Sequence, residues 1–497
     1  MQRLIRSPAP PPRALLLRRF VDDTRGGVLA LSVVLLLFVL GTGGLILDFG
    51  RVWNAQSELQ AFADHAALAA AGELDGTADA ITRANDALAQ LITDRQAYAS
   101  QDATLDAADL QATFLRGLPA ADTDDDFGPF VTNDPALARY VRVAVNPHTV
   151  STIFANALLA VGGNAQVDLD VGATAVAGYT QFVCDISPLM FCPPAGMDRE
   201  QLRGWLPGRQ IRLKTQNFWG PGAFGLLDVN FDPDGPCGSP NQGANFFRCA
   251  VGIERSITRC FSRRGVDVRP GQAAGPSESG LNTRFDIYAT SLKSSRNDPD
   301  FVPAPNVIKG YKPSGGGGCI NNNPQPSNVA QLPQAQCLLA GNCSGPSPRF
   351  SSSQTVDPAQ RSAYVQQNYT DAGMADKTGG ADTRYQMYLN EIANSGTGDI
   401  LDTSAGLEES GRHSCSSGQS ADPDRRVLVA AAVDCSALPP GNASNVPVWD
   451  FYRIFMTNIA GQPETNDAWV EVIEHVDPFS GGAPGAGFVR DFVQLYR

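Results

Sequence analysis

A run of 20 uncharged residues near the start of the chain constrains its structure more than any other feature. Residues 28–47 read VLALSVVLLLFVLGTGGLIL. At a rise of ~1.5 Å per residue, a helix of this length spans the ~30 Å hydrocarbon core of a bilayer. The apolar part of a cleaved signal peptide has ~7–15 residues, and this run continues directly into Asp48. We therefore predict a transmembrane helix and keep a signal peptide as the alternative.

The distribution of charge predicts how this helix is oriented. Residues 1–25 contain six Arg and two Asp. Because positive charge stays on the cytoplasmic side, we expect a single-pass protein of the inner membrane with a cytoplasmic N-terminus and a periplasmic or extracytoplasmic bulk. The whole chain has a formal charge of -13, which disfavours nucleic acid as a partner.

The cysteines favour the same topology. All ten follow the apolar run: Cys184, Cys192, Cys237, Cys249, Cys260, Cys319, Cys337, Cys343, Cys415 and Cys435. An even number in a loop-rich region indicates disulfides formed in an oxidising compartment. Zinc is disfavoured because the sequence has no CxxC pair and its four histidines are not spaced like a zinc set. The connectivity stays open, although two pairs, 184 with 192 and 337 with 343, are close enough in sequence to be local.

The helical pattern continues beyond the membrane span. Apolar residues recur at spacings of three, four and seven, with no Pro between residues 13 and 118, so one long helix is predicted over residues 26–74. Gly76 should end it and Thr77 should cap a second amphipathic helix. The apolar face of that second helix would comprise Ile81, Ala84, Leu88, Leu91 and Ile92.

An apolar stripe on a protruding helix must be covered by packing, which predicts a partner-packing surface on the long helix. Its residues are Trp53, Leu59, Phe62 and Ala66. Trp53 has the alternative role of an anchor at the membrane interface. A second copy of the chain is one candidate for the partner.

The N-terminal segment resembles a known family. Arg25-Gly26-Gly27 opens the apolar helix, Asp48-x-Gly50-Arg51 follows it, and residues 59–71 read LQAFADHAALAAA. This pattern, over about residues 20–75, resembles TadG-like proteins of the Flp (tight adherence) pilus assembly system, with their TadE/TadG-like membrane helix. The stretches 280–288 and 447–474 also look like the longer members of that family. The resemblance implies a role in pilus assembly and pilin-like or other pilus-assembly subunits as partners, and it implies no chemistry.

The sequence lacks two features found in proteins related to this family, the Glu of type IV prepilins and the metal site of von Willebrand A domains. Type IV prepilins carry Glu at the fifth position after the processed Gly, whereas the residues after Gly26 or Gly27 are apolar or Ser32. An anchored accessory component therefore fits better than a polymerising pilin. Some TadG-like proteins resemble von Willebrand A domains, whose metal site uses Asp-x-Ser-x-Ser. The nearest matches begin at Asp185 and Asp402 and lack the final Ser, so no metal site is carried over.

The rest of the chain has the pattern of an α+β protein. We predict a basic cytoplasmic leader at 1–25, a transmembrane and stalk helix at 26–75, a small α/β pilin-like domain at 76–180, and a loop-rich, disulfide-stapled, β-rich domain at 181–497. Alternating residues predict strands, and apolar periodicity predicts short helices at 151–161 and 357–369. The predicted strands are 140–145, 166–177, 210–214, 285–288, 426–433, 452–456 and 469–473.

Motifs for catalysis are missing from the sequence. It has no GxxxxGK[ST] phosphate loop, and residues 275–280 miss the GxSxG elbow by one position. His65, His148, His413 and His475 lie in separate segments, so we expect no catalytic residue, no cofactor and a non-enzymatic protein.

Two acidic segments and one aromatic group remain as candidate binding sites. Asn230, Asp232 and Asp234 partly match a calcium loop but lack its final Glu, so an ordinary Asp/Gly turn is favoured over a metal site. Residues 122–126 form an acidic run that is typical of a solvated loop. The aromatic group suits either the domain core or a partner surface: Phe218, Trp219, Phe224, Trp449, Phe451, Tyr452 and Phe455.

Together these features favour a membrane-anchored, non-enzymatic component of Flp/Tad-type pilus assembly or anchoring in the bacterial cell envelope, with a role in surface adherence. The alternative is a membrane-tethered extracytoplasmic enzyme or a carbohydrate-binding or adhesin domain, since both kinds of protein need an anchor, a stalk and an exposed domain.

Overall fold

The computed structural model divides the chain into two compact units. Unit 1 comprises residues 1–179 and 493–497, and unit 2 comprises residues 180–492. The structure describes residues 27–90, 94–95, 104–119, 121, 124–161, 168–184, 186–215, 219–228, 235–238, 243–254, 261–262, 264–270, 274–436, 438–461, 467–476 and 489–496. The C-terminal residues 493–497 belong to the first unit, whereas the sequence analysis assigned everything after residue 180 to the second domain.

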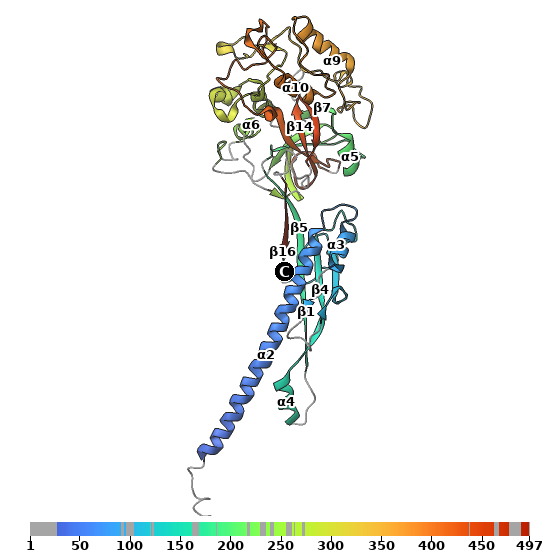
Figure 1. The fold of residues 1–497 in the computed structure, drawn as a ribbon, viewed down its shortest axis with the longest axis vertical. Coiled ribbons are helices and arrows are strands. Elements are labelled where there is room, and N and C mark those ends of the chain that lie inside the picture. The colour runs from blue at the N-terminus through green and yellow to red at the C-terminus, as the bar shows by residue number, and fades with distance from the viewer. Residues whose placement is uncertain are drawn as a thin grey trace, which may run out of the picture. The chain divides into compact units, whose positions relative to one another are not determined.

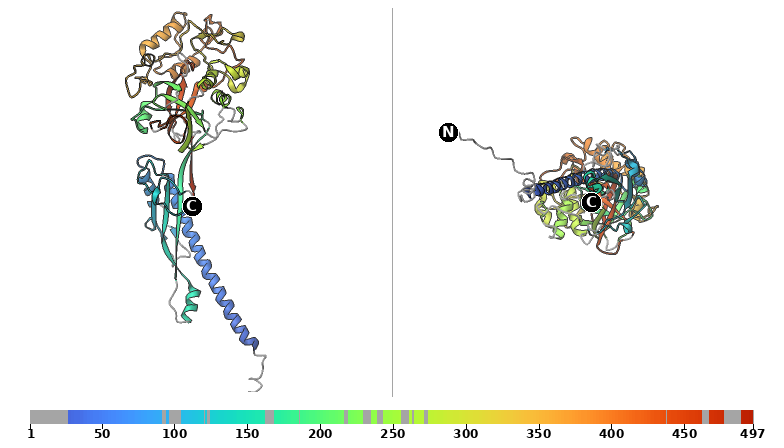
Figure 2. Two further views of the ribbon diagram at one scale, coloured as in Figure 1. Left: turned by 180° about the vertical axis from the view of Figure 1, so that it is seen from behind. Right: turned by 90° about the horizontal axis from the view of Figure 1, so that it is seen from below.

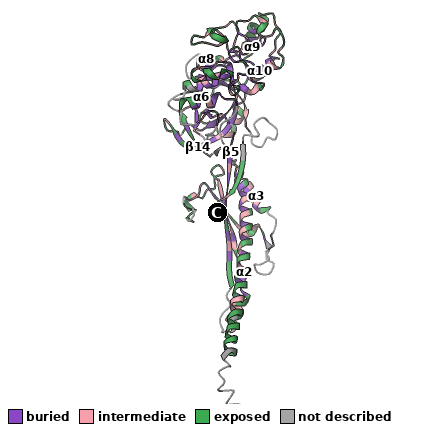
Figure 3. Ribbon diagram, turned by 90° about the vertical axis from the view of Figure 1, so that its left-hand side faces the viewer, coloured by how far each residue is buried: buried purple, intermediate pink, exposed green. Residues whose placement is uncertain are grey.

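A single helix dominates unit 1. Helix α2 (Gly27–Gly72) confirms the long helix expected from the sequence. Residues 31–40 of α2 are all exposed, whereas buried residues recur every three or four positions in its C-terminal half, as Figure 3 shows by colour. Within the described residues, α2 is the one helix long and apolar enough to cross a membrane.

The C-terminal half of α2 packs against a sheet of five described strands (Figure 1). Four of them, β16 (Val489–Leu495), β5 (Asp168–Val183), β4 (Tyr140–Ser151) and β3 (Leu110–Leu115), follow one another in that spatial order, and the short β9 (Phe261–Ser262) pairs with the end of β5. β4 and β5 fulfil the predictions for 140–145 and 166–177. Helix α4 (Ile153–Val161) connects them, close to the predicted 151–161. Figure 2 shows the same sheet from behind.

The core of unit 1 forms between α2 and this sheet. Small residues on α2, including Ala63, Ala67 and Ala70, are fully buried, and Val141, Val143 and Ala175 face them from the strands. Ala is the best helix former and leaves room for the sheet to approach the helix axis closely. The Ala-rich composition of residues 59–71 is therefore explained by contact within the chain.

The second helix of unit 1 begins later than predicted. The chain turns at Gly76, whose φ of +84° is favourable for Gly. Helix α3 (Ala80–Ala89) follows, with Asp79 at its N-cap. The Thr77 hydroxyl does not cap α3 but donates to the carboxylates of Asp75 and Asp79. Ala84 and Leu88 lie in the core as expected, while Leu91 and Ile92 lie outside the described residues.

Unit 2 is built on a seven-stranded sheet whose pairings close on themselves. The spatial order is β10-β14-β13-β6-β8-β7-β15, and β14 pairs with β15 in addition. The strands β6, β8, β7, β15, β14 and β13 therefore form a closed ring, and β10 bridges β8 and β14. The bounds are β6 Leu189–Phe191, β7 Gln210–Thr215, β8 Ala223–Asp228, β10 Arg264–Pro270, β13 Val427–Val433, β14 Ala443–Met456 and β15 Asp467–His475. Four of the predicted strands lie in β7, β13, β14 and β15.

All six strands of the ring contribute apolar side chains to one core. Within this core is a nearly filled space of about 10 Å³, lined by residues such as Phe191, Phe224 and Ile454. Helices α6 (Ala244–Gly252) and α7 (Ala274–Leu281) add Phe246 and Leu281 to the same cluster. Closing the ring removes free sheet edges, and a ring this small is filled by its own side chains.

A long excursion between β10 and β13 covers part of the ring. It contains the short helices α8 (Gln336–Ala340), α9 (Pro358–Val365) and α10 (Arg384–Ala393), joined by turns and irregular segments. α9 and the single π turn after it, 366–370, fulfil the helix predicted at 357–369. The strand predicted at 285–288 is wrong, because Asn282–Phe285 forms a 3-10 turn ended by Asp286 at a φ of +63°.

Among the residues that the structure describes, four disulfides cross-link unit 2. They join Cys192 to Cys435, Cys237 to Cys249, Cys319 to Cys415 and Cys337 to Cys343. The local pair 337 with 343 is confirmed. The local pair 184 with 192 is wrong, because β6 lies parallel to β13 and this brings Cys192 next to Cys435. Cys184 is also disulfide-bonded, and Cys260 lies outside the described residues.

The disulfides should differ in their contribution to stability. Cys192 and Cys435 are 243 residues apart, whereas Cys337 and Cys343 are 6 apart. In the chain-entropy model, the first disulfide stabilises the folded state by about 5 kcal/mol and the second by about 2 kcal/mol, and these contributions are lost when the bonds are removed. We expect the Cys192→Ser/Cys435→Ser variant to unfold at clearly lower denaturant than the Cys337→Ser/Cys343→Ser control. Equal midpoints for the two variants would contradict this ranking.

Candidate functional site

Helix α2 presents two apolar faces with different surroundings. Leu59, Phe62 and Ala66 are buried in the core of unit 1, so the structure places three of the four predicted partner-packing residues against the chain's own sheet. Trp53 is 70% exposed. The sequence correctly indicated an apolar stripe at these three positions. The surface that covers the stripe is the chain's own sheet, whose strands lie much later in the sequence.

The exposed apolar face of α2 lies elsewhere on the helix. Ile46 and Phe49 are 70% and 72% exposed, and together with Trp53 they form what we name the outer stripe. At ~100° per residue, these three positions fall within roughly 60° of one another on the helix surface. The outer stripe extends the exposed apolar surface of the run by about one and a half turns beyond Asp48. It is the candidate interface for another helix.

A cavity in unit 2 collects two of the aromatic residues singled out above. It has a volume of about 460 Å³ and is lined by Trp219 and Trp449, by the 193–197 segment, and by Asp434 and Ser436. The Trp219 indole N–H donates to the Gly441 carbonyl at 3.0 Å, which fixes the ring. Phe224, Phe451, Tyr452 and Phe455 are core residues instead, and Phe218 lies outside the described residues.

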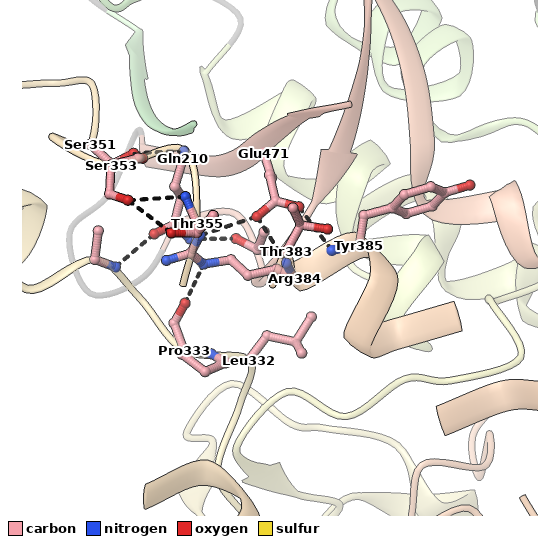
Figure 4. Close-up of polar contacts among 12 residues, drawn as sticks. Gln210, Leu332, Pro333, Ser351, Ser353, Thr355, Thr383, Arg384, Tyr385 and Glu471 are labelled. Carbon is pink, nitrogen blue, oxygen red and sulfur yellow. Dashed lines mark hydrogen bonds and ion pairs between the residues drawn. The ribbon is translucent and has the colours of Figure 1, made fainter. Parts of the chain in front are cut away.

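A buried ion pair ties α10 to the ring of strands (Figure 4). Glu471 on β15 accepts hydrogen bonds from the backbone N–H groups of Arg384 and Tyr385 at 3.0 and 2.9 Å, and its carboxylate lies 3.1 Å from the Arg384 guanidinium. Arg384 also donates to the Pro333 carbonyl. Both carboxylate oxygens of Glu471 accept hydrogen bonds from α10, so this cluster stabilises the fold.

A second carboxylate is buried under the excursion. Glu391 on α10 accepts hydrogen bonds from the hydroxyls of Tyr364 and Tyr369, at 2.5 and 2.8 Å, and from the Asn306 amide at 2.8 Å. Burial raises the pKa of Glu391 to about 7, although these three donors oppose the shift. No pattern in the sequence points to Glu391, since its donors come from two segments that are distant in the chain, one at Asn306 and one at 364–369.

The structure describes the other candidate residues only in part. Asn230, Asp232 and Asp234 lie outside the described residues, as do Asp122 and Asp185. Asp124 and Asp126 accept hydrogen bonds from backbone N–H groups two residues ahead, which is the geometry of ordinary turns. Asp402 similarly accepts from the Ser404 N–H. Among the described residues, no three His, Cys, Asp or Glu side chains are grouped to hold a metal ion.

The raised pKa of Glu391 makes the stability of unit 2 depend on pH. The native state binds this proton up to pH about 7 and the unfolded chain only up to about 4.5, so the free energy of unfolding falls as pH rises between these values. The total change is on the order of 3 kcal/mol. We expect Glu391→Gln to remove this slope in urea unfolding of the detergent-solubilised protein between pH 5 and 8. Parallel pH profiles for wild type and variant would contradict the assignment.

Comparison with known proteins gives one match. Residues 26–73 match the family model described as putative Flp pilus-assembly TadE/G-like. No curated protein and no solved structure matches the chain. The matched residues coincide with α2, Gly27–Gly72, so the similarity covers the membrane-spanning half of the helix, the outer stripe and the buried Ala-rich face.

An apolar helix of membrane-spanning length and the family match both indicate a membrane-anchored protein of a pilus system. The match covers the helix, and the remainder of unit 1 and the whole of unit 2 lie outside it. The chain thus carries a TadE/G-like N-terminal segment of the type found in putative Flp pilus-assembly proteins.

Proposed function

We propose that this protein is a non-enzymatic component of Flp/Tad-type pilus assembly or anchoring, held in the inner membrane by α2, with a role in surface adherence. The observation that carries the proposal is the coincidence of the TadE/G-like match, residues 26–73, with α2. The Arg-rich residues 1–25 favour a cytoplasmic N-terminus. The disulfides of unit 2 suit the periplasm.

The outer stripe is the proposed contact with pilin-like or other pilus-assembly subunits, including a second copy of this chain. Phe49 and Trp53 lie beyond the apolar run, so lipid chains alone do not cover them. Large aromatic residues contribute most to the cores of protein interfaces. The opposite face of α2 is already occupied by the sheet of unit 1, which leaves the outer stripe for a partner.

Complementation of a deletion strain tests this role. We expect loss of the gene to abolish pili and surface adherence, and Phe49→Ser/Trp53→Ser to lower both toward the deletion level, because the substitutions remove the apolar contact without touching the core. Asn54→Ala, at an exposed neighbouring position, is the control and should restore both. Immunoblots of isolated membranes establish equal protein levels. Normal piliation in the deletion strain would refute the function, and normal piliation with the double variant would refute the interface.

The aromatic cavity of unit 2 favours a second candidate function, carbohydrate binding by an adhesin-like domain. Indole rings bind the apolar faces of sugars, and Trp219 and Trp449 line one cavity of about 460 Å³. Asp434 is the acid among its described lining residues, and it accepts a hydrogen bond from the Ser436 N–H at 3.0 Å. This lining suits binding better than hydrolysis by a pair of carboxylates.

Titration of the full-length protein with envelope polysaccharide fragments tests this second function. We expect a change in tryptophan fluorescence with wild type, a retained but weaker response with Trp219→Phe, which keeps an aromatic face, and loss of binding with Trp219→Ala. Calorimetry provides a readout that does not depend on the substituted fluorophore. Equal affinity for Trp219→Ala and wild type would exclude the cavity as the sugar site.

A further inference from the structure

Helix α4 of unit 1 is apolar on nearly every side. Its nine residues, IFANALLAV, contain one polar side chain, Asn156, and no charge. Ile153 and Phe154 are 54% and 46% exposed, and Ala157 and Ala160 are exposed as well. At ~100° per residue these four positions share an arc of roughly 120°. Such a face is unfavourable in water and requires a cover.

Two contacts fix α4 against a particular level of α2. The Ala155 backbone N–H donates to the Asp48 carboxylate at 2.7 Å, and Asp48 is 4% exposed. Gly44 lies against Phe154, because a Cβ on Gly44 would come 2.8 Å from the Phe154 Cβ. In Figures 1 and 2, α4 lies beside the N-terminal half of α2.

These contacts place α4 at the edge of the bilayer. Gly44 precedes the end of the uncharged run, Leu47, by three residues, which is ~5 Å along the helix. If the run spans the hydrocarbon core, Phe154 lies within that distance of its boundary. Interfacial helices bury their apolar face ~5–10 Å deep in the same zone.

Asp48 is suited to this position. A carboxylate buried next to lipid is costly unless it is paired. The N-terminus of α4 supplies a hydrogen-bond donor and the positive end of the helix dipole. On the other side of α4, the Asn156 amide donates to the Asp168 carboxylate at 3.2 Å. The polar groups of α4 are thus directed to the protein, and the described residues leave its apolar arc partly exposed.

We propose that α4 is a second membrane-contacting element, whose apolar arc of Ile153, Phe154, Ala157 and Ala160 inserts among the acyl chains of the outer leaflet. The occupant is lipid because the arc continues the lipid-facing surface of α2 at the same depth. The inference goes beyond the proposed function and rests on the membrane span of α2 alone.

A second contact would fix the rotation of α2 in the bilayer. Gly44 and Asp48, which hold α4, lie on the opposite side of α2 from the outer stripe, roughly 150° away by helix geometry. With α4 seated in lipid, the outer stripe faces away from unit 1's sheet and stays open to another subunit. A lone transmembrane helix has no comparable restraint on rotation.

Photolabelling of the full-length protein in phosphatidylcholine vesicles tests the proposal. The vesicles contain a phospholipid with a diazirine in its acyl chain, and labelled peptides are located by mass spectrometry. We expect label in the apolar run of α2 and in α4, and several-fold less in α3, a ten-residue helix of the same unit. Labelled α2 with α4 labelled no more than α3 would overturn the proposal.

Two glycine variants test the docking of α4 on α2. Gly44→Leu drives a side chain into Phe154 and should lower the labelling of α4 several-fold while α2 stays labelled. Gly43→Leu is the matched control, because a Cβ there meets nothing within 4 Å, and should leave the labelling unchanged. Equal labelling of α4 in the two variants would contradict docking through Gly44. If Gly44→Leu does not fold, the difference in lipid labelling between α4 and α3 in the wild-type protein still tests the proposal.

Discussion

The packing of α2 against the sheet of unit 1 is the interaction on which the rest of the structure depends. One continuous helix meets two environments: its N-terminal half is apolar all round, and its C-terminal half buries small side chains such as Ala63 and Ala67 against β3, β4 and β5. Gln56 and Gln60 add hydrogen bonds to the carbonyls of Gly172 and Thr174 on β5. These contacts hold the membrane segment and the sheet of unit 1 as one body, so the anchor cannot swing freely relative to that sheet.

Unit 2 is stabilised by a different combination of forces. Its ring of strands is filled by apolar side chains, whereas the long excursion between β10 and β13 combines a second apolar cluster with disulfides and buried charges. Arg426 is an example: its guanidinium stacks on Phe285, Tyr388 and Phe455 and donates to backbone carbonyls. Burial lowers the pKa of Arg426 to about 10, which leaves it charged at neutral pH. Such fully bonded polar groups specify one arrangement of an irregular segment.

The sequence predicted the features that depend on local pattern. The uncharged run and the Ala-rich repeat predicted α2 almost to its ends, and alternation predicted β4, β5, β7, β13 and β15. Cys337 and Cys343 were a candidate local pair because they are only six residues apart, and the structure joins them. The α+β class, with a long N-terminal helix and a β-rich, disulfide-linked second region, follows from the same signals.

The features that depend on contacts between distant segments were not predictable. Leu59, Phe62 and Ala66 were assigned to a partner because the strands that cover them begin about fifty residues later. Cys184 was the candidate partner for Cys192 by sequence distance alone, because the parallel contact of β6 with β13, which brings Cys192 to Cys435, leaves no mark in either segment. The same holds for the meeting of Trp219 with Trp449 and for the donors around Glu391, each assembled by the ring and its excursion. The outer stripe was found only through Trp53, since Ile46 and Phe49 were read as part of the membrane run and its end.

We propose that α2 keeps this protein in the membrane as an assembly or anchoring component. Intact-mass spectrometry of non-reduced protein from isolated membranes and from sheared surface fibres tests it most directly, because it reports the N-terminus, the disulfides and the distribution together. The account predicts a chain that retains residues 1–25, with paired cysteines, in the membrane fraction. A chain that begins at Gly26 or Gly27 and is found mainly in the fibres would contradict it and would indicate a processed minor pilin or adhesin.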